Sequence, residues 1–245
     1  MKINEEMIHC FLFGCSEEQT AGNAAQFEAE ACVAGVTVVQ AFPPGNTRAL
    51  RQVAEACETE YALLYTKPDR LQLGYHALDR LLSIAADSGA EMWYADHYVV
   101  LPDGTRKAMP LIDCQEGSVR DDFQMGSLLL VKTQTLRDYL SQPHLHSYRY
   151  AALYDLRLFV MRRGMPEHIS EYLYTEIEND TRLSGQKQFD YVDPKNRGVQ
   201  TEMERAVTRH LRAVNAYLHG NEYDEVRLTE GNFPVEATEI GRAHV

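Results

Sequence analysis

Apolar residues follow two spacings along the chain, and these spacings predict strands and helices in alternation. Short apolar or alternating runs bounded by turn residues are typical of strands. Such runs cover residues 7–13, 36–42, 61–65, 92–94, 126–131 and 168–177. Apolar residues at intervals of three and four are typical of helices with one buried face. This spacing occurs over residues 21–32, 47–57, 78–88, 133–140, 149–163 and 201–219.

Residues 60–98 show the alternation most clearly. An apolar strand over 61–65 leads into a Lys-Pro-Asp turn, a helix and a second apolar strand. A strand, a helix and a strand with short joints form a βαβ unit, so the sheet is expected to be at least partly parallel. Ligands of such sheets bind beyond the carboxyl ends of the strands. A binding site is therefore expected at residues 66–70 and 96–98.

The remaining turn and cap signals complete the predicted fold. Pro102, Asp103 and Gly104 lie between two strand-like runs and predict a β-hairpin. Thr201 and Glu204 have the spacing of a capping box, which predicts the start of a C-terminal helix. The expected fold class is α/β: a mixed, mainly parallel sheet with helices on both faces, followed by that C-terminal helix.

Composition excludes several classes of partner. Of the 245 residues, 44% are hydrophobic and 24% are charged, which is ordinary for a globular protein. The formal net charge is -12 and the charge pattern has no basic run, which argues against nucleic acid and anionic membranes as partners. The apolar runs are far shorter than the ~20 residues that a membrane helix needs.

The cysteines and the N-terminus bear on the compartment. The 5 cysteines include no close pair, which suits buried thiols in a reducing compartment. Acidic residues come just before the short apolar run at the N-terminus, whereas a signal peptide has basic residues there. We therefore predict a cytoplasmic protein.

Several segments, taken in order, resemble the family-2 glycosyltransferases with the GT-A fold. The strand YALLY, the helix before it and the later YAD at residues 94–96 match the nucleotide-binding half of that family. DLRL at 155–158 and HISEYLY at 168–174 match its acceptor half. The resemblance covers about residues 7–180. It implies a parent protein that transfers a sugar from a nucleotide donor to a glycan or lipid-linked acceptor.

Two catalytic elements of the family are altered here. The family's strand ends in Asp-x-Asp or Asp-x-Asp-Asp, which holds a divalent cation against the diphosphate. The matching residues 66–69 are Thr-Lys-Pro-Asp, so only the last acid is present. The family's catalytic base precedes the DL dipeptide, where this chain has Ala152 and Leu153. Neither side chain accepts a proton, so the favoured hypothesis is a degenerate, non-catalytic GT-A domain.

Two alternatives stay open. The chain could be an active, metal-independent transferase in which Lys67 or Arg70 neutralises the diphosphate. Mg²⁺ or Mn²⁺ is expected only in an active enzyme, together with a nucleotide sugar. The chain could also be a non-enzymatic α/β binding or scaffold domain, because the loop after the first strand matches the family poorly.

The residues predicted to bind a nucleotide are Asp69, Asp96 and Lys67. Lys67 and Asp69 occupy the altered acidic cluster, and Asp96 ends the YAD segment, where a carboxylate could meet a ribose. No catalytic residue and no metal ligand is assigned. The loop residues His144 and His146 could contact a metal, but no third ligand is in view.

The predicted division of the chain is a GT-A-like domain over 1–198, a C-terminal helix and linker over 199–238, and a tail over 239–245. The tail reads EIGRAHV, the translation of one frame of a common sequencing-adapter oligonucleotide, so we interpret it as a scar. The preceding NFPVEA resembles the junction to an intact family-2 domain. This predicts a truncated protein, whose partner is a C-terminal catalytic GT-A domain of the same chain.

Overall fold

The computed structural model describes residues 6–14, 17–177 and 197–218. Its strands are β1 (Ile8–Phe13), β2 (Val33–Val39), β3 (Tyr61–Tyr65), β4 (Arg70–Leu73), β5 (Met92–Val100), β6 (Arg106–Met109), β7 (Leu128–Lys132) and β8 (Glu167–Ile177). Its helices are α1 (Glu17–Glu28), α2 (Thr47–Ala56), α3 (Ala77–Ser88), α4 (Thr133–Leu140), α5 (Ala152–Met161) and α6 (Arg197–Ala213). The sequence pattern placed α1 and β2 several residues too late and missed β4.

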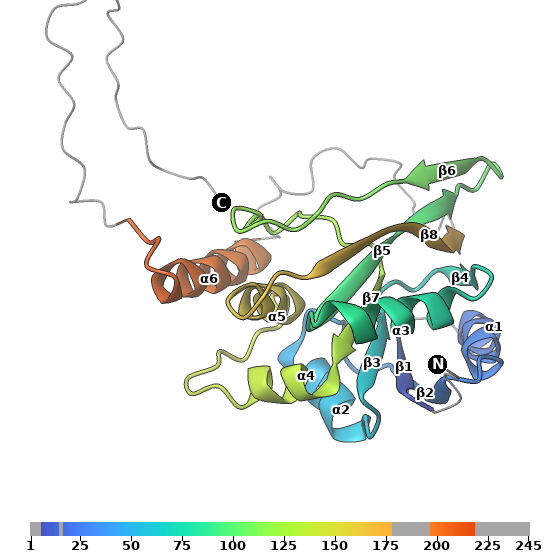
Figure 1. Ribbon diagram of the computed structural model, residues 1–245. Coiled ribbons are helices and arrows are strands. Elements are labelled where there is room, and N and C mark those ends of the chain that lie inside the picture. The colour runs from blue at the N-terminus through green and yellow to red at the C-terminus, as the bar shows by residue number, and fades with distance from the viewer. Residues whose placement is uncertain (1–5, 15–16, 178–196, 219–245) are drawn as a thin grey trace, which may run out of the picture.

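The strands form one 8-stranded sheet in the order β2-β1-β3-β7-β5-β8-β4, with β6 paired to β5 (Figure 1). Strands β1, β2, β3, β5 and β8 run in one direction, and β4, β6 and β7 run against them. The expected α/β fold with a mixed, mainly parallel sheet is therefore confirmed. The expected βαβ unit is correct in direction, but β7 lies between β3 and β5 and pairs antiparallel with both.

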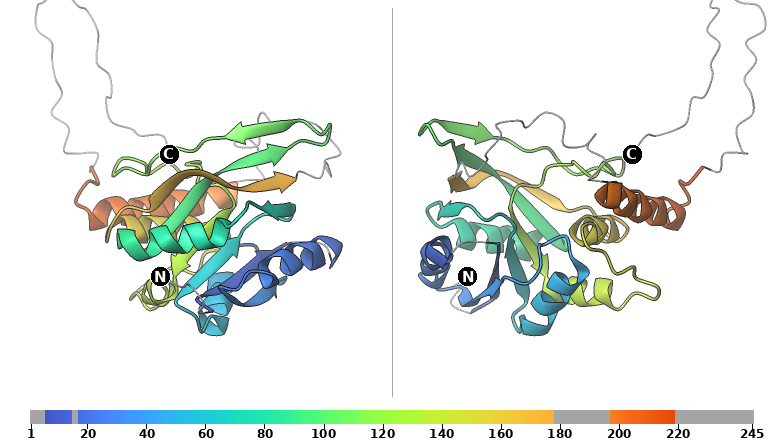
Figure 2. Two further views of the ribbon diagram at one scale, coloured as in Figure 1. Left: turned by 45° about the vertical axis from the view of Figure 1, so that its right-hand side comes forward. Right: turned by 180° about the vertical axis from the view of Figure 1, so that it is seen from behind.

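Helices cover both faces of the sheet (Figure 2). Phe27 of α1 and Leu78 of α3 pack into the core on one face. Leu50 of α2, Leu136 of α4 and Leu156 of α5 pack into the core on the other. The central strands are apolar on both sides because both sides are covered, which is why they read as continuous apolar runs in the sequence.

Two side chains of α1 hold the edge strand β4 in place. Asn23 is fully buried; its amide donates to the carbonyl oxygen of Asp69 at 3.1 Å and accepts from the N–H of Leu71 at 2.8 Å. Gln26 donates to the carbonyl oxygen of Leu71 at 2.6 Å and accepts from the N–H of Leu73 at 3.0 Å. These bonds satisfy backbone groups on the side of β4 that no strand pairs. The strand therefore depends on a helix distant in sequence.

Helix α6 packs along α5 and holds the segment that leads into it. The carboxylate of Glu202 accepts hydrogen bonds from the backbone N–H groups of Arg149, Tyr150 and Ala151. Ala151 is the N-cap residue of α5 and has no capping side chain of its own. A neighbouring helix thus supplies the acceptor for backbone N–H groups that precede α5 and have no partner within it.

The capping box expected at Thr201 and Glu204 is wrong. Helix α6 already includes Arg197, and the Thr201 hydroxyl donates to the carbonyl oxygen of Arg197 at 2.8 Å, inside the helix. A Ser or Thr hydroxyl within a helix can bond the carbonyl one turn earlier, so its presence alone does not mark a helix start.

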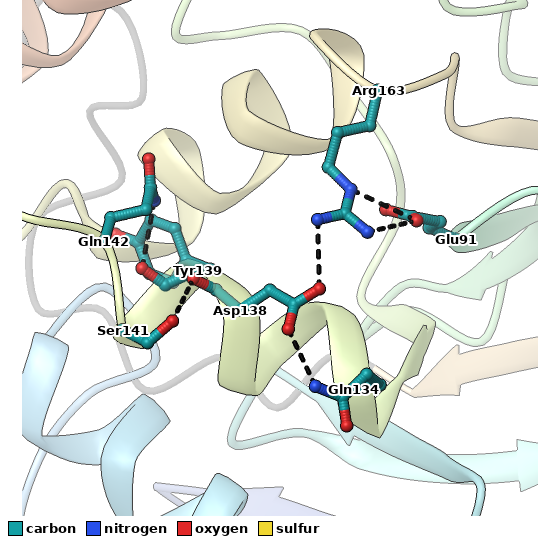
Figure 3. A network of polar contacts seen from close by, with 7 residues as sticks. All are labelled: Glu91, Gln134, Asp138, Tyr139, Ser141, Gln142 and Arg163. Atoms are coloured by element: carbon teal, nitrogen blue, oxygen red, sulfur yellow. Dashed lines mark hydrogen bonds and ion pairs between the residues drawn. The ribbon is translucent and has the colours of Figure 1, made fainter.

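A polar network fixes α4 against the far end of α5 (Figure 3). Arg163, just past α5, pairs with Glu91 at 2.8 Å and with Asp138 of α4 at 3.0 Å. Gln134 donates to the other oxygen of Asp138 at 2.7 Å from one turn earlier in the same helix. Arg163 is 40% exposed, so each pair stabilises the fold only slightly and the network mainly orients the two helices.

The described cysteines, Cys10, Cys32, Cys57 and Cys114, are buried and free, whereas Cys15 lies outside the described residues. Among the described residues, the helices are too short or too polar to span a bilayer. The linker and the tail expected after residue 218 also lie outside them. The cytoplasmic location and the division of the chain stay predictions.

Candidate functional site

The carboxyl ends of β1 and β3 meet at one edge of the sheet. Gly14 follows β1 with a φ of +68°, and a Cβ built on it would lie 3.7 Å from Cβ of Pro68 in the loop after β3. Asp69 ends that loop, and Asn23 holds its carbonyl oxygen from α1. The fold therefore brings together two loops at the edge where open α/β sheets bind ligands. This is the edge at which the sequence predicts a site.

Lys67 in the same loop belongs to a buried polar cluster, the Glu176 cluster, formed by Lys67, His97, Ser127, Tyr174 and Glu176. The side chain of Glu176 is fully buried. It accepts a hydrogen bond from the Ser127 hydroxyl at 2.5 Å and forms an ion pair with the Lys67 ammonium. His97 Nε2 lies 3.5 Å from the same carboxylate. A buried carboxylate is costly unless it is paired and hydrogen-bonded, and here it is both. Lys67 itself is 43% exposed, so its ammonium can still meet an anion arriving from solvent.

The aromatic members close this cluster from the other side. The His97 and Tyr174 rings stack at 4.9 Å, and the Tyr174 hydroxyl accepts from the N–H of Ser127 at 2.9 Å. Burial lowers the pKa of His97, although Glu176 opposes the shift. Burial also raises the pKa of Tyr174 to about 12. Gly126 has a φ of +68°, and a Cβ there would lie 2.3 Å from the Tyr174 hydroxyl, so no other residue fits without movement.

A second cluster, the His168 cluster, lies on the opposite face of β5 and consists of Asp96, Asp113 and His168. Asp96 is buried and its Oδ1 accepts from His168 Nε2 at 2.8 Å and from the N–H of Leu111 at 2.7 Å. His168 Nδ1 contacts Asp113 Oδ1 at 2.8 Å, and Asp113 is 79% exposed. The ring of Tyr94 stacks on His168 at 5.1 Å.

The His168 cluster borders an open cavity of about 480 Å³ beside the segment that joins β6 to β7. Its lining includes Ile112, Asp113, Gln115, Ser118, His168 and Ser170. The exposed Asp113 carboxylate, oriented by a buried His–Asp pair, can accept a hydrogen bond or a proton from a hydroxyl group in this cavity. The arrangement therefore suits a polyhydroxylated ligand.

The structure places the three predicted residues in different surroundings. Lys67 and Asp69 lie in one loop at the sheet edge, whereas Asp96 points to the other face of β5 and is held by His168. Adjacent strand residues point to opposite faces, so Asp96 and His97 join separate clusters. The prediction that these residues bind a nucleotide stays a prediction.

Sequence reasoning missed most partners in the two clusters: Asp113, Ser127, His168 and Glu176. A partial signal for Glu176 is the short run Tyr172, Leu173 and Tyr174 just before it, because a carboxylate beside a largely buried apolar run needs a buried partner. The sequence HISEYLY at 168–174 resembles the family's acceptor half, but no local pattern indicates the contacts of His168 with Asp96 and Asp113, since they join segments more than fifty residues apart.

The loop after β3 does not fit a divalent cation. Mg²⁺ and Mn²⁺ require several oxygen ligands, mainly carboxylates. Here the Thr66 hydroxyl donates to the carbonyl oxygen of Ser127, Lys67 brings a positive charge and Pro68 has no ligand atom in its side chain. Asp69 is the one carboxylate in the loop. Within the described part of the chain, His, Cys, Asp and Glu side chains form no group of three that could hold a metal.

The region that matches the family's catalytic base is closed by packing. Ala152 is fully buried at the start of α5, and its N–H donates to the carbonyl oxygen of Gly45 at 2.8 Å. The nearest acid along the helix, Asp155, is fully buried and paired with Arg209 at 2.9 Å and with the Tyr139 hydroxyl at 3.1 Å. Burial raises the pKa of Asp155, which Arg209 partly offsets.

No protein-family model matches the chain, and no curated protein matches its sequence. Solved structures match at the level of fold. S. aureus TarS, residues 1–349 in complex with UDP, matches with a TM-score of 0.53 and 11% identity over 88% of this chain and 68% of that chain. Glucosyl-3-phosphoglycerate synthase from Mycobacterium tuberculosis, in complex with Mn²⁺, uridine-diphosphate-glucose and glycerol 3-phosphate, matches with a TM-score of 0.51 and 9% identity over 84% and 80%. Mannosyl-3-phosphoglycerate synthase from Rubrobacter xylanophilus matches with a TM-score of 0.51 and 11% identity over 89% and 78%.

These similarities concern the fold, because the sequence identities are low. The neighbours are glycosyltransferases with the GT-A fold, so the expected resemblance to that fold is confirmed. What each neighbour binds is a property of that neighbour.

Proposed function

We propose that the chain is a glycosyltransferase-like domain that binds a nucleotide sugar at the carboxyl edge of its sheet and does not itself catalyse transfer. One observation carries the proposal: a GT-A-like fold brings the loop after β1 against the loop after β3, with Gly14 beside Pro68. This edge is the usual ligand position in open α/β sheets. The similar TarS and glucosyl-3-phosphoglycerate synthase structures contain UDP and uridine-diphosphate-glucose.

Each predicted residue has a physical role in this proposal. The half-exposed Lys67 ammonium, already held by Glu176, neutralises part of a diphosphate without a metal. Asp69 accepts hydrogen bonds from the ribose or the sugar. Asp96 is buried, so in this proposal it does not contact the ligand. It acts by fixing His168 beside the open cavity.

The ligand chemistry of the described site supports a domain that does not catalyse transfer. The loop after β3 offers one carboxylate where a bound cation needs several. Ala152 and Leu153 occupy the positions that match the family's base. Asp155 is already paired with Arg209 and hydrogen-bonded to Tyr139. In this proposal the domain positions a donor or a glycan for a catalytic GT-A domain further along the same chain, as the sequence at residues 232–237 predicts.

A second candidate, an active metal-independent transferase, is favoured by the His168 cluster. Asp113 is an exposed carboxylate in an open cavity and is oriented by His168, so it can remove a proton from an acceptor hydroxyl. Lys67 would then stabilise the leaving diphosphate.

Calorimetric titration of the full chain with UDP and GDP, with and without Mn²⁺, tests the proposal. We expect metal-independent UDP binding that Asp69→Asn weakens by about tenfold, since the hydrogen bond to the ribose or the sugar loses its charged acceptor. The matched control is Asp87→Asn, which changes an exposed acid near the C-terminal end of α3, outside the loop of Asp69. This variant should bind UDP as the wild type does. A folded sample that binds neither nucleotide would contradict the proposal and favour a binding or scaffold domain without a nucleotide.

Release of UDP from uridine-diphosphate-glucose separates the two candidates. The non-catalytic domain should release no more UDP than buffer does. Release that depends on an added acceptor and disappears in Asp113→Asn would establish the active candidate instead.

A further inference from the structure

A second cavity, distinct from the sheet edge, lies between α6 and the segment that joins α4 to α5. It has a volume of about 530 Å³ and is open to solvent. Figure 1 shows α6 lying beside α5, away from β4 and β6. We call it the α6 pocket and define it by His144, His146, Tyr148, Arg205, Arg209 and Arg212.

The spacing of the arginines explains how they share the pocket. Arg205, Arg209 and Arg212 are four and three residues apart, so they lie on one face of α6. Like charges at these intervals repel one another and weaken a helix. The chain as a whole has a formal net charge of -12, so three arginines on one face of one helix stand out from the rest of the molecule.

The arginine charges are only partly balanced. Arg209 pairs with the buried Asp155 at 2.9 Å, and Glu204 also lines the pocket. Arg205 donates to Nε2 of His146 at 2.5 Å, and Arg212 lies 4.7 Å from the ring centroid of Tyr217. A neutral imidazole acceptor and an aromatic ring do not cancel a charge. Within residues 6–14, 17–177 and 197–218, neither Arg205 nor Arg212 forms an ion pair with a carboxylate.

Two of the residues that line this pocket carry unpartnered polar atoms. The side chain of Tyr148 is 1% exposed, and its hydroxyl has no hydrogen-bond partner among the described residues. Burial raises the pKa of Tyr148 to about 12, so the hydroxyl keeps its proton at neutral pH and can donate. Arg209 Nε is a second buried donor without a hydrogen-bond acceptor there. A buried donor without an acceptor is costly, and an oxygen-rich anion would supply the acceptors.

These observations point to the chemistry of the ligand. Planar guanidinium groups and a phenol are donors, and guanidinium is the side-chain group best suited to bidentate contact with phosphate oxygens. A cavity of about 530 Å³ is in the size range of small-molecule sites and exceeds a single phosphate ion. We propose that the α6 pocket binds the phosphate group of a small phosphorylated compound, a monoester or a diphosphate, at a site separate from the sheet edge.

Occupancy of this pocket would couple to the packing of α6 on α5. Arg209 contacts the bound anion on one side and Asp155 of α5 on the other. Tyr148 lies in the segment before α5, and its backbone N–H donates to the Thr47 hydroxyl at the start of α2. The ligand would therefore join α6, the segment before α5 and α2.

Calorimetric titration of the full chain with pyrophosphate at low ionic strength tests the proposal. We expect binding that weakens as salt is added. Arg205→Gln and Arg212→Gln should each lower the affinity by about tenfold. Tyr148→Phe removes a hydroxyl that bonds nothing in the described structure, so the variant should fold normally and yet bind more weakly.

The matched control is Arg51→Gln, which removes the same charge from an exposed position on α2 outside the pocket, whereas Arg70→Gln tests binding at the sheet edge. Pyrophosphate affinity that falls in Arg70→Gln and stays unchanged in Arg205→Gln and Arg212→Gln would overturn the proposal. Binding to vesicles of phosphatidylglycerol without binding to pyrophosphate would also overturn it. If Asp69→Asn weakens UDP binding and Arg212→Gln leaves it unchanged, UDP binds at the sheet edge. The two proposed sites are therefore tested independently.

Discussion

The two polar clusters beside β5 use the same pair of strands and differ in how they are closed. In the Glu176 cluster, a fully buried carboxylate meets a serine, a lysine and a histidine from three other segments. In the His168 cluster, the buried Asp96 orients a histidine whose other nitrogen holds a solvent-exposed carboxylate at an open cavity. The Glu176 carboxylate forms its hydrogen bonds within the protein, whereas the Asp113 carboxylate is exposed to solvent. Burial therefore favours a mainly structural role for the Glu176 carboxylate, whereas the Lys67 ammonium and the Asp113 carboxylate are open to solvent.

Removing Glu176 should give the largest effect. Glu176→Ala leaves the Ser127 hydroxyl and the Lys67 ammonium without their buried acceptor, and breaking a buried ion pair typically costs about 3–5 kcal/mol of unfolding free energy. Urea denaturation would measure it. We expect the low end of the range because Lys67 is partly exposed.

Glu171→Ala is the matched control on the same strand. Glu171 pairs with Arg80 at 2.6 Å, but both side chains are more than two-fifths exposed, so the loss should be about 0–1 kcal/mol. Equal losses for Glu171→Ala and Glu176→Ala would show that burial does not distinguish the two carboxylates.

Acidification should destabilise the protein through His97. Burial lowers the pKa of His97 below its ordinary 6.5, so between the two values the unfolded chain binds more protons than the folded one. The contribution to stability is therefore complete above pH 6.5 and is lost as the pH falls through the folded pKa. Burial lowers the pKa of His9 and of His210 as well, and both add to the same slope.

Urea denaturation at about pH 7, 6 and 5 measures this slope. His97→Phe keeps a ring against Tyr174 and removes the titrating group, so its slope should be shallower than that of the wild type. If His97→Phe leaves the dependence of unfolding free energy on pH unchanged, His97 does not contribute to it.

Changing Asp113 should have the smallest effect on stability. Asp113 is 79% exposed, and losing such a contact changes the free energy of unfolding by about 0.5 kcal/mol or less. Asp113→Asn keeps the shape of the side chain, so circular dichroism and urea denaturation should match the wild type. A loss of several kcal/mol would place Asp113 among the structural groups and remove the contrast between the two clusters.

The secondary structure was largely predictable because it depends on local spacing. The strand Tyr61–Tyr65 and the helix Thr133–Leu140 have the predicted bounds. The edge strand Arg70–Leu73 was missed because Asn23 and Gln26, in a helix far back in the sequence, satisfy its backbone. The start of α6 was placed too late because a Thr hydroxyl can bond inside a helix as well as at its start.

The candidate site was predictable only in part. The sequence located the loop of Lys67 and Asp69 at a strand end, since carboxyl ends of parallel strands carry ligand loops. It could not place Asp96 on the opposite side of β5 from the Lys67 contacts, and it gave no sign of Asp113. The arginines of the α6 pocket were visible as residues of one helix, but nothing local indicated that His144 and His146 would face them.

The sequence by itself determined the class of fold, the alternation of strands and helices, and the presence of a single acid, Asp69, among residues 66–69. Tertiary structure alone decided which strand lies beside which, with β7 between β3 and β5. It also decided that the Glu176 carboxylate is buried and that the Asp113 carboxylate faces solvent. The physical reason is that periodicity is a property of neighbouring residues, whereas burial and ion pairing depend on residues brought together from distant parts of the chain.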